Sequence, residues 1–280
     1  MLWRVSRYPS HGRKTMNSTR IYAIFIRQVL LVWHNKTRFV NIFLWFGLDI
    51  LLWGFTTTYL NTLGYAAFDF VPVLLGAVIL WSFLTAVQQG VMRAFFEDVW
   101  SHNFLNLFAS PLTVGEYLAG LILSSIASAV IGFVFMLAVA LPFGYSIFPL
   151  GLYALPCLLI LFLFGLALGI FTTALVLRLG PAAEWFAWPV PFIIQPFAGV
   201  FYPISSLPAV LQPVAKAIPP AYAFEGMREL LGAGSVSLSN LVWGGLSAMV
   251  YVILTYLFFL HIYGYVLKTG LLTRFSAENG

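Results

Sequence analysis

Residues 150–177 read LGLYALPCLLILFLFGLALGIFTTALVL, a segment without a single charged side chain. A helix needs about twenty consecutive apolar residues to cross a bilayer core about 30 Å thick. The segment therefore predicts a transmembrane helix. The same character extends along the chain, because 61% of its residues are hydrophobic and only 8% are charged, against about a quarter charged in ordinary soluble domains.

Further apolar segments lie on both sides of this one. We predict an all-α polytopic membrane protein with six transmembrane helices, because the short alternating strands of an outer-membrane barrel are not visible in the sequence. The expected spans are residues 39–60, 71–96, 115–141, 150–177, 183–202 and 239–266.

The positive charges are concentrated near the amino terminus. Eight of the fourteen Lys and Arg residues precede residue 39, and the first acidic residue is Asp49. This asymmetry places the amino terminus in the cytoplasm under the positive-inside rule, and six spans bring the carboxyl terminus to the same side. We accordingly interpret the net charge of +5 as contact with membrane lipids and not with nucleic acid. Residues 1–16 and 269–280 are expected to be cytoplasmic tails, and the first fifteen residues lack the apolar core of a signal peptide.

Residues 17–38 have a helical pattern that is too highly charged to span a membrane. At about 100° per residue, one side carries a line of basic residues, namely Arg20, Arg27, His34 and Arg38. Apolar and aromatic side chains cover the opposite side. We expect an interfacial amphipathic helix whose rings enter the membrane and whose guanidinium groups point to solvent. A basic segment that only stops translocation is the alternative.

The loop between the second and third spans combines a helix break with apolar residues. Ser110-Pro111 breaks the helix, and Thr113 with Glu116 has the spacing of a capping box for the third span. The residues before the break would form a short apolar helix, which either needs a partner surface or packs on its own bundle. The residues of interest in this loop are Val99, Phe104, Leu105, Leu107, Phe108, Ser110 and Pro111.

Two polar residues within the spans are candidates for lining a transport pathway. Asp49 lies midway along the first span, where a carboxylate is costly unless it is paired, protonated or facing water. It either lines the pathway or bonds a neighbouring helix. Gln195 lies in the fifth span among Pro189, Pro191 and Pro196, and proline-kinked helices with a polar group often line cavities.

Two segments carry a family resemblance. They read SPLTVGEYLAG at 110–120 and GVFYPISSLPAVLQPVAKAIPPAYAFEGMREL at 199–230. Together with the interfacial helix and the six spans, they resemble the permease subunit of ABC-2 type transporters, the ATP-binding-cassette exporters, from about residue 17 onward. Residues 39–268 would be the ABC-2 type transmembrane domain. The chain departs from related loops at SHNFLN, residues 101–106, where those loops often carry a Gly-Thr-hydrophobic-Glu turn.

The resemblance implies a division of labour between subunits. The loop around Val99–Pro111 would be the coupling helix that docks on an ATP-binding subunit. That partner would bind ATP and Mg²⁺, and this chain would bind no cofactor. In this chain no Lys follows a Gly, so the sequence has no G-x-x-x-x-G-K-[ST] phosphate loop. The expected assembly has two ATP-binding subunits and two permeases, as a homodimer or with a close paralogue. Gly165 and Gly169 form a small-xxx-small pair, a candidate contact between the two permeases.

The resemblance also implies that residues 199–230 form re-entrant half-helices between spans five and six, on the outer side. Non-helical backbone at membrane depth is tolerated only where protein or a water-filled cavity shields it. The prolines would divide this block into pieces near 206–217 and 220–231, with Pro208 and Pro220 in first helical turns. We expect the block to be the outer gate, with Pro203 at its start.

Three charged residues follow these prolines. Glu225, Arg228 and Glu229 lie on one face at helical spacing, so Arg228 can pair with Glu225. We interpret the three residues as a structural clamp in preference to a substrate ligand.

The function that the resemblance implies is export across the plasma (inner) membrane. Short outer loops and apolar spans favour a hydrophobic or amphipathic, drug- or lipid-like substrate, and export of a lipid-linked polysaccharide or glycoconjugate is the alternative. Two other classes are a gradient-driven carrier or channel and a membrane-embedded transferase. The chain itself is not expected to be an enzyme, because its acids are isolated and its four histidines and single Cys157 lack metal-ligand spacing.

Overall fold

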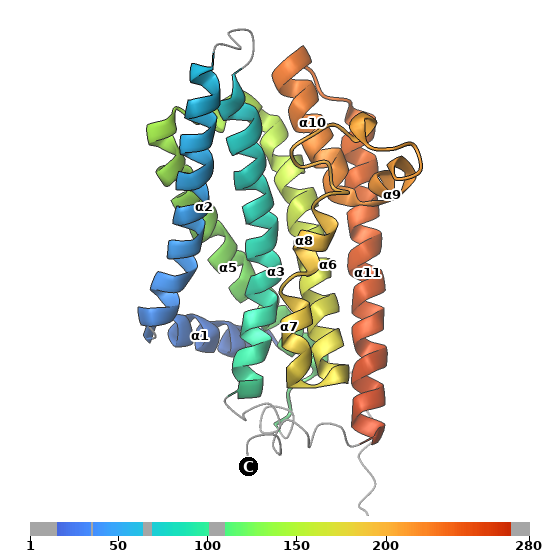
Figure 1. The fold of residues 1–280 in the computed structure, drawn as a ribbon. Coiled ribbons are helices and arrows are strands. Elements are labelled where there is room, and N and C mark those ends of the chain that lie inside the picture. The colour runs from blue at the N-terminus through green and yellow to red at the C-terminus, as the bar shows by residue number, and fades with distance from the viewer. Residues whose placement is uncertain (1–15, 35, 64–68, 101–109, 270–280) are drawn as a thin grey trace, which may run out of the picture.

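The computed structural model describes residues 16–34, 36–63, 69–100 and 110–269, which are helical without any strand. Figure 1 shows a bundle of long helices, with α1 lying across one end and α9 and α10 near the other. We call these the α1 end and the α10 end. The helices are α1 Ser18–His34, α2 Lys36–Thr62, α3 Gly76–Trp100, α5 Val114–Ala140, α6 Ala154–Leu179, α7 Glu184–Ala187, α8 Val190–Ile194, α9 Gln212–Ala217, α10 Pro219–Ala233 and α11 Leu238–Thr269.

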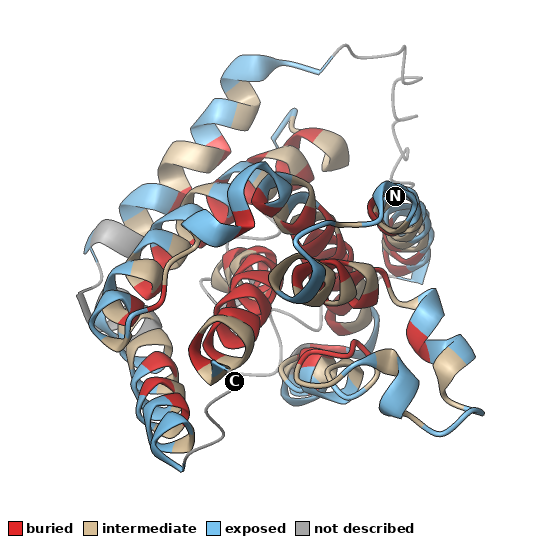
Figure 2. Ribbon diagram, turned by 90° about the horizontal axis from the view of Figure 1, so that it is seen from above, coloured by how far each residue is buried: buried red, intermediate tan, exposed pale blue. Residues whose placement is uncertain are grey.

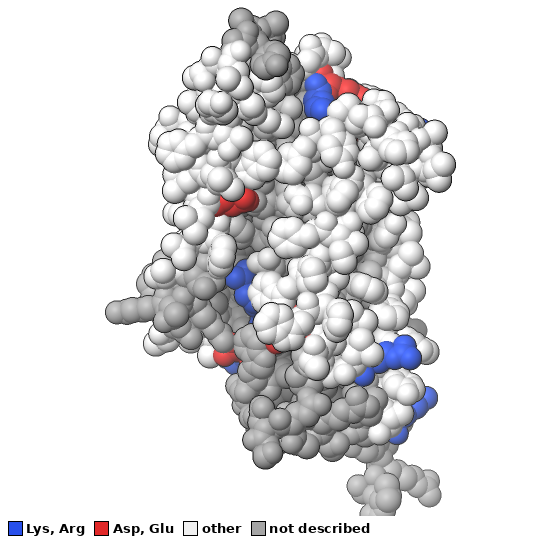
Figure 3. All heavy atoms as spheres, viewed as in Figure 1, with Lys and Arg blue, Asp and Glu red and all other residues white. Residues whose placement is uncertain are grey.

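Among the residues that the structure describes, five helices are long and apolar enough to cross a membrane. They confirm the predicted first, second, third, fourth and sixth spans. Figure 3 shows that the visible face is mostly uncharged, with acidic and basic atoms together near the α10 end and further Lys and Arg atoms near the α1 end. The five spans are Phe43–Thr62, Val71–Asp98, Val114–Phe143, Phe148–Leu179 and Leu238–Thr269.

The fifth predicted span, residues 183–202, is not one continuous helix. It contains the short helices α7 and α8, which lie one above the other along the bundle (Figure 1). The backbone at Trp188 and Pro189 keeps right-handed helical dihedral angles, but a proline has no N–H to donate to the preceding turn. Residues 184–195 are therefore a helical path with missing hydrogen bonds, which we call the kinked segment.

The central helix of the bundle is α3. Of its apolar span 83% is buried, against 56% for α6, 22% for α2 and α5 and 17% for α11. Figure 2 shows buried residues gathered at the centre and exposed residues around the rim. The outer helices therefore present apolar faces of the kind that lipid covers, while α3 is shielded from it.

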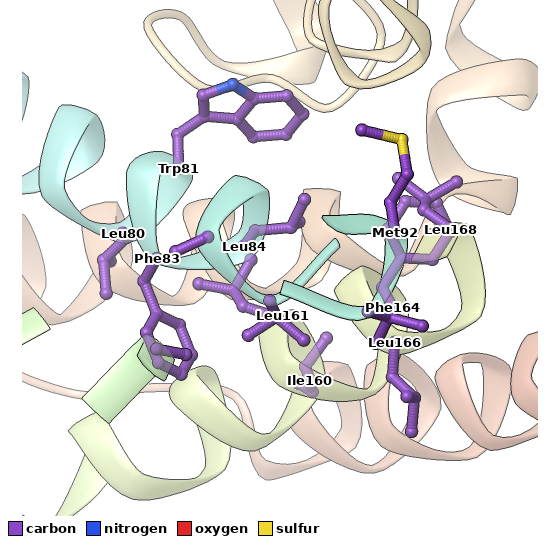
Figure 4. Close-up of a cluster of buried hydrophobic side chains, with 14 of the residues drawn as sticks. Leu80, Trp81, Phe83, Leu84, Met92, Ile160, Leu161, Phe164, Leu166 and Leu168 are labelled. Carbon is purple, nitrogen blue, oxygen red and sulfur yellow. The ribbon is translucent and has the colours of Figure 1, made fainter. Parts of the chain in front are cut away.

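Two glycines of α6 permit its close packing on α3. A Cβ at Gly165 would lie 2.6 Å from the carbonyl oxygen of Leu84, and one at Gly169 would lie 2.8 Å from Cβ of Val91. Side chains of both helices fill the surrounding contact, including those of Leu84 and Leu161 (Figure 4). The expectation that this pair contacts a second permease is wrong, because both glycines are buried against α3 of the same chain.

Candidate functional site

At the α1 end, Glu116 closes the start of α5. The Thr113 hydroxyl accepts a hydrogen bond from the Glu116 amide at 3.2 Å, and the Glu116 carboxylate accepts one from the Thr113 amide at 2.8 Å. This is the predicted capping box, which satisfies two amides at the helix start. The Glu116 side chain is fully buried, so it needs further partners.

Those partners come from α1 and from the residue just before it. The Asn17 amide donates to Oε1 of Glu116 at 2.8 Å, and Arg20 lies 3.5 Å from its Oε2. The same guanidinium nitrogen of Arg20 donates to the carbonyl of Pro111 at 2.7 Å. The beginning of α1 is thus bound to the residues that lead into α5.

A second buried carboxylate binds α1 further along. Asp98, near the end of α3, is 1% exposed, forms an ion pair with Arg27 and accepts a hydrogen bond from the Tyr117 hydroxyl at 2.7 Å. Next to Arg27, the Gln28 side-chain amide donates to the carbonyl of Ala94 at 3.2 Å. Asp98 therefore joins α1, α3 and α5 at one point.

Close packing accompanies these polar contacts. A Cβ at Gly120 would lie 2.5 Å from a methyl group of Ile24 and 3.2 Å from the carbonyl oxygen of Ile21. Only glycine lets α1 lie this near to α5. Ile24 itself is buried, so this side of α1 faces protein.

The helix predicted at 17–38 is confirmed as α1, which ends at His34, but the prediction that its guanidinium groups point to solvent is wrong. Arg20 and Arg27 form ion pairs with the bundle, and their side chains are only 33% and 26% exposed. The reason is that Asp98 and Glu116 are buried carboxylates, which require compensating charge. His34 lies outside this cluster and is exposed.

Asp98 and Glu116 flank the predicted coupling loop. Of its residues, Ser110 and Pro111 are described and exposed. Phe104, Leu105, Leu107 and Phe108, as well as the side chain of Val99, lie outside the described part of the chain. The sequence interpretation missed Asp98 and Tyr117; the available signal was an unpaired basic line in 17–38 and acids on both sides of the loop.

At the α10 end, the predicted pairing of Arg228 with Glu225 is confirmed at 3.2 Å. Glu225 also accepts a hydrogen bond from the Ile204 amide at 2.6 Å, and Arg228 donates to the Val200 carbonyl at 3.3 Å. The pair therefore binds the backbone of residues 200–204 to α10.

Glu229, the residue after Arg228, binds a different segment. Its carboxylate accepts hydrogen bonds from the Ser237 amide at 3.0 Å and from the Asn240 side chain at 3.1 Å. These contacts connect α10 to the beginning of α11. Glu229 is thus a partner of α11 and not part of the ion pair next to it.

The prolines of this block start the short helices only in part as predicted. Pro220 lies buried in the first turn of α10, which begins at Pro219. α9 begins at Gln212 with Pro213 in its first turn, whereas Pro208 lies in the preceding turn, where its carbonyl accepts from the Leu211 amide at 2.8 Å. Pro203 is exposed, just before a short 3₁₀ turn at Ile204–Ser206.

The two pathway candidates lie apart. Asp49 of α2 accepts a hydrogen bond from the Ser82 hydroxyl of α3 at 3.2 Å, so its carboxylate bonds a neighbouring helix. Gln195 is half-buried at the end of α8. The structure brings neither residue to the clusters at the two ends of the bundle.

Apolar membrane-length helices, a helix bound across one end and a clamped proline-rich block at the other define a multi-pass helical membrane protein. The model of the ABC-2 type transporter family matches residues 19–231. The chain therefore belongs to the ABC-2 type transporter family and is an ABC transporter permease. No curated protein matches it.

Proposed function

We propose that this chain is the permease subunit of an ATP-driven exporter that moves a hydrophobic or amphipathic, drug- or lipid-like substrate across the plasma membrane. Family membership supports the permease role, and the apolar outer faces of α2, α5 and α11 support a substrate that partitions into lipid. Energy comes from a separate ATP-binding subunit that holds ATP and Mg²⁺. Two copies of each subunit form the transporter.

One observation carries the proposal: two buried carboxylates bracket the coupling loop and bind α1 to both of its flanks. Asp98 precedes the loop and Glu116 follows it, and α1 contacts both. A force that an ATP-binding subunit applies to the loop would then reach α1, α3 and α5 together, because separating either ion pair would leave a buried carboxylate uncompensated. The residues on both sides of the loop are thus fixed to the bundle.

Orientation follows from the basic residues. The α1 end faces the cytoplasm, since the chain's positive charge is concentrated in and before α1. The kinked segment is the fifth of six spans: its twelve residues cover about 18 Å as a helix, and the turns that follow it complete the crossing. Both termini are then cytoplasmic.

The α10 end is the outer gate. The Glu225–Arg228 pair sets the position of residues 200–204, and α9 and α10 are re-entrant half-helices that dip into the outer leaflet. Gln195, at the end of the kinked segment, faces the pathway between two permease copies. These assignments rest on the family resemblance and on the broken backbone, which needs shielding at membrane depth.

Co-purification from membranes followed by mass spectrometry tests the partnership. We expect an ATP-binding subunit to accompany the wild-type chain and to be lost when the loop flank is altered by Asp98→Ala. The matched control is Glu229→Ala at the opposite end, which should retain the subunit. Absence of an ATP-binding subunit from the wild-type preparation contradicts the proposal.

Reconstitution in liposomes tests the substrate class. ATP hydrolysis should be stimulated by lipids or amphipathic drugs, whereas stimulation only by undecaprenyl-linked glycans would identify a glycoconjugate exporter. Flux that follows an ion gradient without ATP would identify a carrier or channel and refute the proposal.

A further inference from the structure

A buried side-chain amide on α3 lies beside the kinked segment. Gln88 is fully buried, and its Nε2 lies 3.5 Å from the carbonyl oxygen of Ala187 in α7. In a regular helix that carbonyl would accept from the amide of residue 191. Residue 191 is a proline, so Gln88 supplies the donor that the backbone lacks.

The contacts of this amide are loose. Nε2 is also 3.5 Å from the Thr172 hydroxyl oxygen, and both of its contacts to oxygen are longer than the usual 2.9–3.0 Å or so for N–H···O bonds. The Met92 sulfur, a weak acceptor, lies 3.6 Å away. Among the residues described, Oε1 of Gln88 has no hydrogen-bond partner. Burying Oε1 without a partner costs free energy, which the contacts of Nε2 offset in part.

A second polar atom without a partner, here a donor, lies on the same side of α3. Trp81 precedes Gln88 by seven residues, two helical turns, is 4% exposed, and its indole N–H has no partner within the described chain. Figure 4 shows Trp81 pointing away from Leu161 and Phe164 of α6. Gln88 thus lies where α3, α6 and the kinked segment meet, whereas the Trp81 indole lies on a side of α3 turned away from these α6 residues.

We propose that Gln88 is a positioning residue for transport, which holds the kinked segment in the arrangement described here by bonding the Ala187 carbonyl. Because the bond is long and shared, the segment can leave this position at small cost and return to it. The kinked segment is therefore the part of the bundle that moves against α3 during the cycle. The movement rests on the proposed function, whereas the hydrogen bond does not.

A double-mutant cycle between residues 88 and 191 tests the hydrogen bond in the purified chain. Gln88→Met keeps the length of the side chain and removes both polar groups, leaving the Ala187 carbonyl without a donor. We expect the Tm to fall by about 2–4 °C. Pro191→Ala restores a backbone N–H at a helical position, so Gln88→Met in that background should change Tm by less than about 1 °C.

Gln89→Met is the matched control for this cycle. It makes the same chemical change on the next residue of α3, which is half-buried, and should give the same small effect in both backgrounds. If Gln88→Met lowers the Tm equally with and without Pro191→Ala, the inferred hydrogen bond is overturned. It is also overturned if Gln88→Met leaves the Tm unchanged in both backgrounds.

A polarity-sensitive fluorophore on the kinked segment tests the movement. The fluorophore is attached to Ile193→Cys, an exposed position, in a Cys157→Ala background that lacks the only native cysteine. The measurement is made on the complex with the ATP-binding subunit. We expect ATP and Mg²⁺ to shift the emission, and Gln88→Met to show most of that shift without nucleotide, because it destabilises the resting position. Adding Pro191→Ala to Gln88→Met should restore the nucleotide-free emission of the parent protein.

A label at Leu254→Cys on the exposed face of α11 controls for general effects of ATP and should not shift. An unchanged emission at residue 193 on adding ATP, or the same response in Gln88→Met as in the parent, overturns the positioning role. Failure to isolate an ATP-binding subunit overturns the proposed function and with it the movement, while the Tm cycle still decides the hydrogen bond.

Discussion

Replacing Arg27 with methionine should strongly destabilise the protein, because it removes the cation that faces a buried carboxylate. Asp98 is 1% exposed and would retain its hydrogen bond from Tyr117 at 2.7 Å. Removing one member of a buried ion pair costs about 3–5 kcal/mol. The Arg27 side chain is 26% exposed, which lets water reach the vacated position, so we expect the lower value, about 3 kcal/mol.

The assay is thermal unfolding of the purified chain, followed by its tryptophan fluorescence. A loss of about 3 kcal/mol corresponds to a fall in Tm of about 6–12 °C for a protein of this size. The double variant Arg27→Met with Asp98→Leu removes both charges and should lose less than Arg27→Met alone, because apolar replacements of a buried pair are often neutral or stabilising.

Lys268→Met is the control, since Lys268 is exposed at the end of α11 and its loss should leave Tm unchanged. If Arg27→Met shifts Tm no more than Lys268→Met, the carboxylate is not compensated by Arg27. If the double variant is as unstable as Arg27→Met, the cost comes from lost packing of the arginine stem and not from an uncompensated charge.

The remaining predictions concern other contacts of the same kind. In unfolding experiments Gly165→Ala should destabilise the protein by about 1–3 kcal/mol, because its Cβ would meet the Leu84 carbonyl at 2.6 Å. Its control is Gly245→Ala, which has open space around it and should be neutral or stabilise the protein by up to about 1 kcal/mol. Glu116→Gln should cost about 1–3 kcal/mol, because its NH₂ group would face one of two backbone amides that both need an acceptor, and an unchanged Tm would contradict this geometry. Arg228→Met should speed amide hydrogen exchange at residues 200–204, because the arginine bonds this backbone. An unaltered exchange rate would refute this prediction.

Features that depend on local sequence were predictable. Five spans follow from hydropathy, since each apolar segment is longer than the bilayer is thick. The capping box at Thr113 and Glu116 and the pairing of Glu225 with Arg228 also follow from fixed spacing, because partners three residues apart in a helix lie on one face.

Features that depend on distant segments were not predictable in the same way. The line of basic residues in α1 shows that they share one face of the helix, but not what that face contacts. The partner of Arg27, Asp98, lies 71 residues further along the chain. An amphipathic helix at a bundle end can bind protein acids or lipid phosphates with the same side chains, and the sequence pattern is identical in both cases. Gly165 and Gly169 illustrate the same difficulty, because close packing within a chain and between chains requires the same small residues.

Proline position was predictable only in part. A proline in a first helical turn is favourable, but several prolines in one block compete for that role. Pro213 and Pro219 with Pro220 lie in first turns, while Pro208 is in the turn before α9. In the kinked segment the prolines leave the dihedral angles helical and remove the hydrogen bonds, which a pattern of apolar residues does not reveal.

Contacts along the whole length of the bundle involve α3. At one end Asp98 binds α1 through Arg27, in the middle Gln88 contacts the kinked segment, and Ser82 bonds Asp49 of α2. Toward the α10 end, the Trp81 ring lies 6.3 Å from that of Phe224 in α10. The 25 residues of α3 extend about 37 Å as a helix, so a shift at the proposed coupling loop would reach the proposed outer gate along one helix. Because α3 packs tightly on α6 through two glycines, it resists tilting toward that side, and the loosely bonded kinked segment is where such a shift meets least resistance.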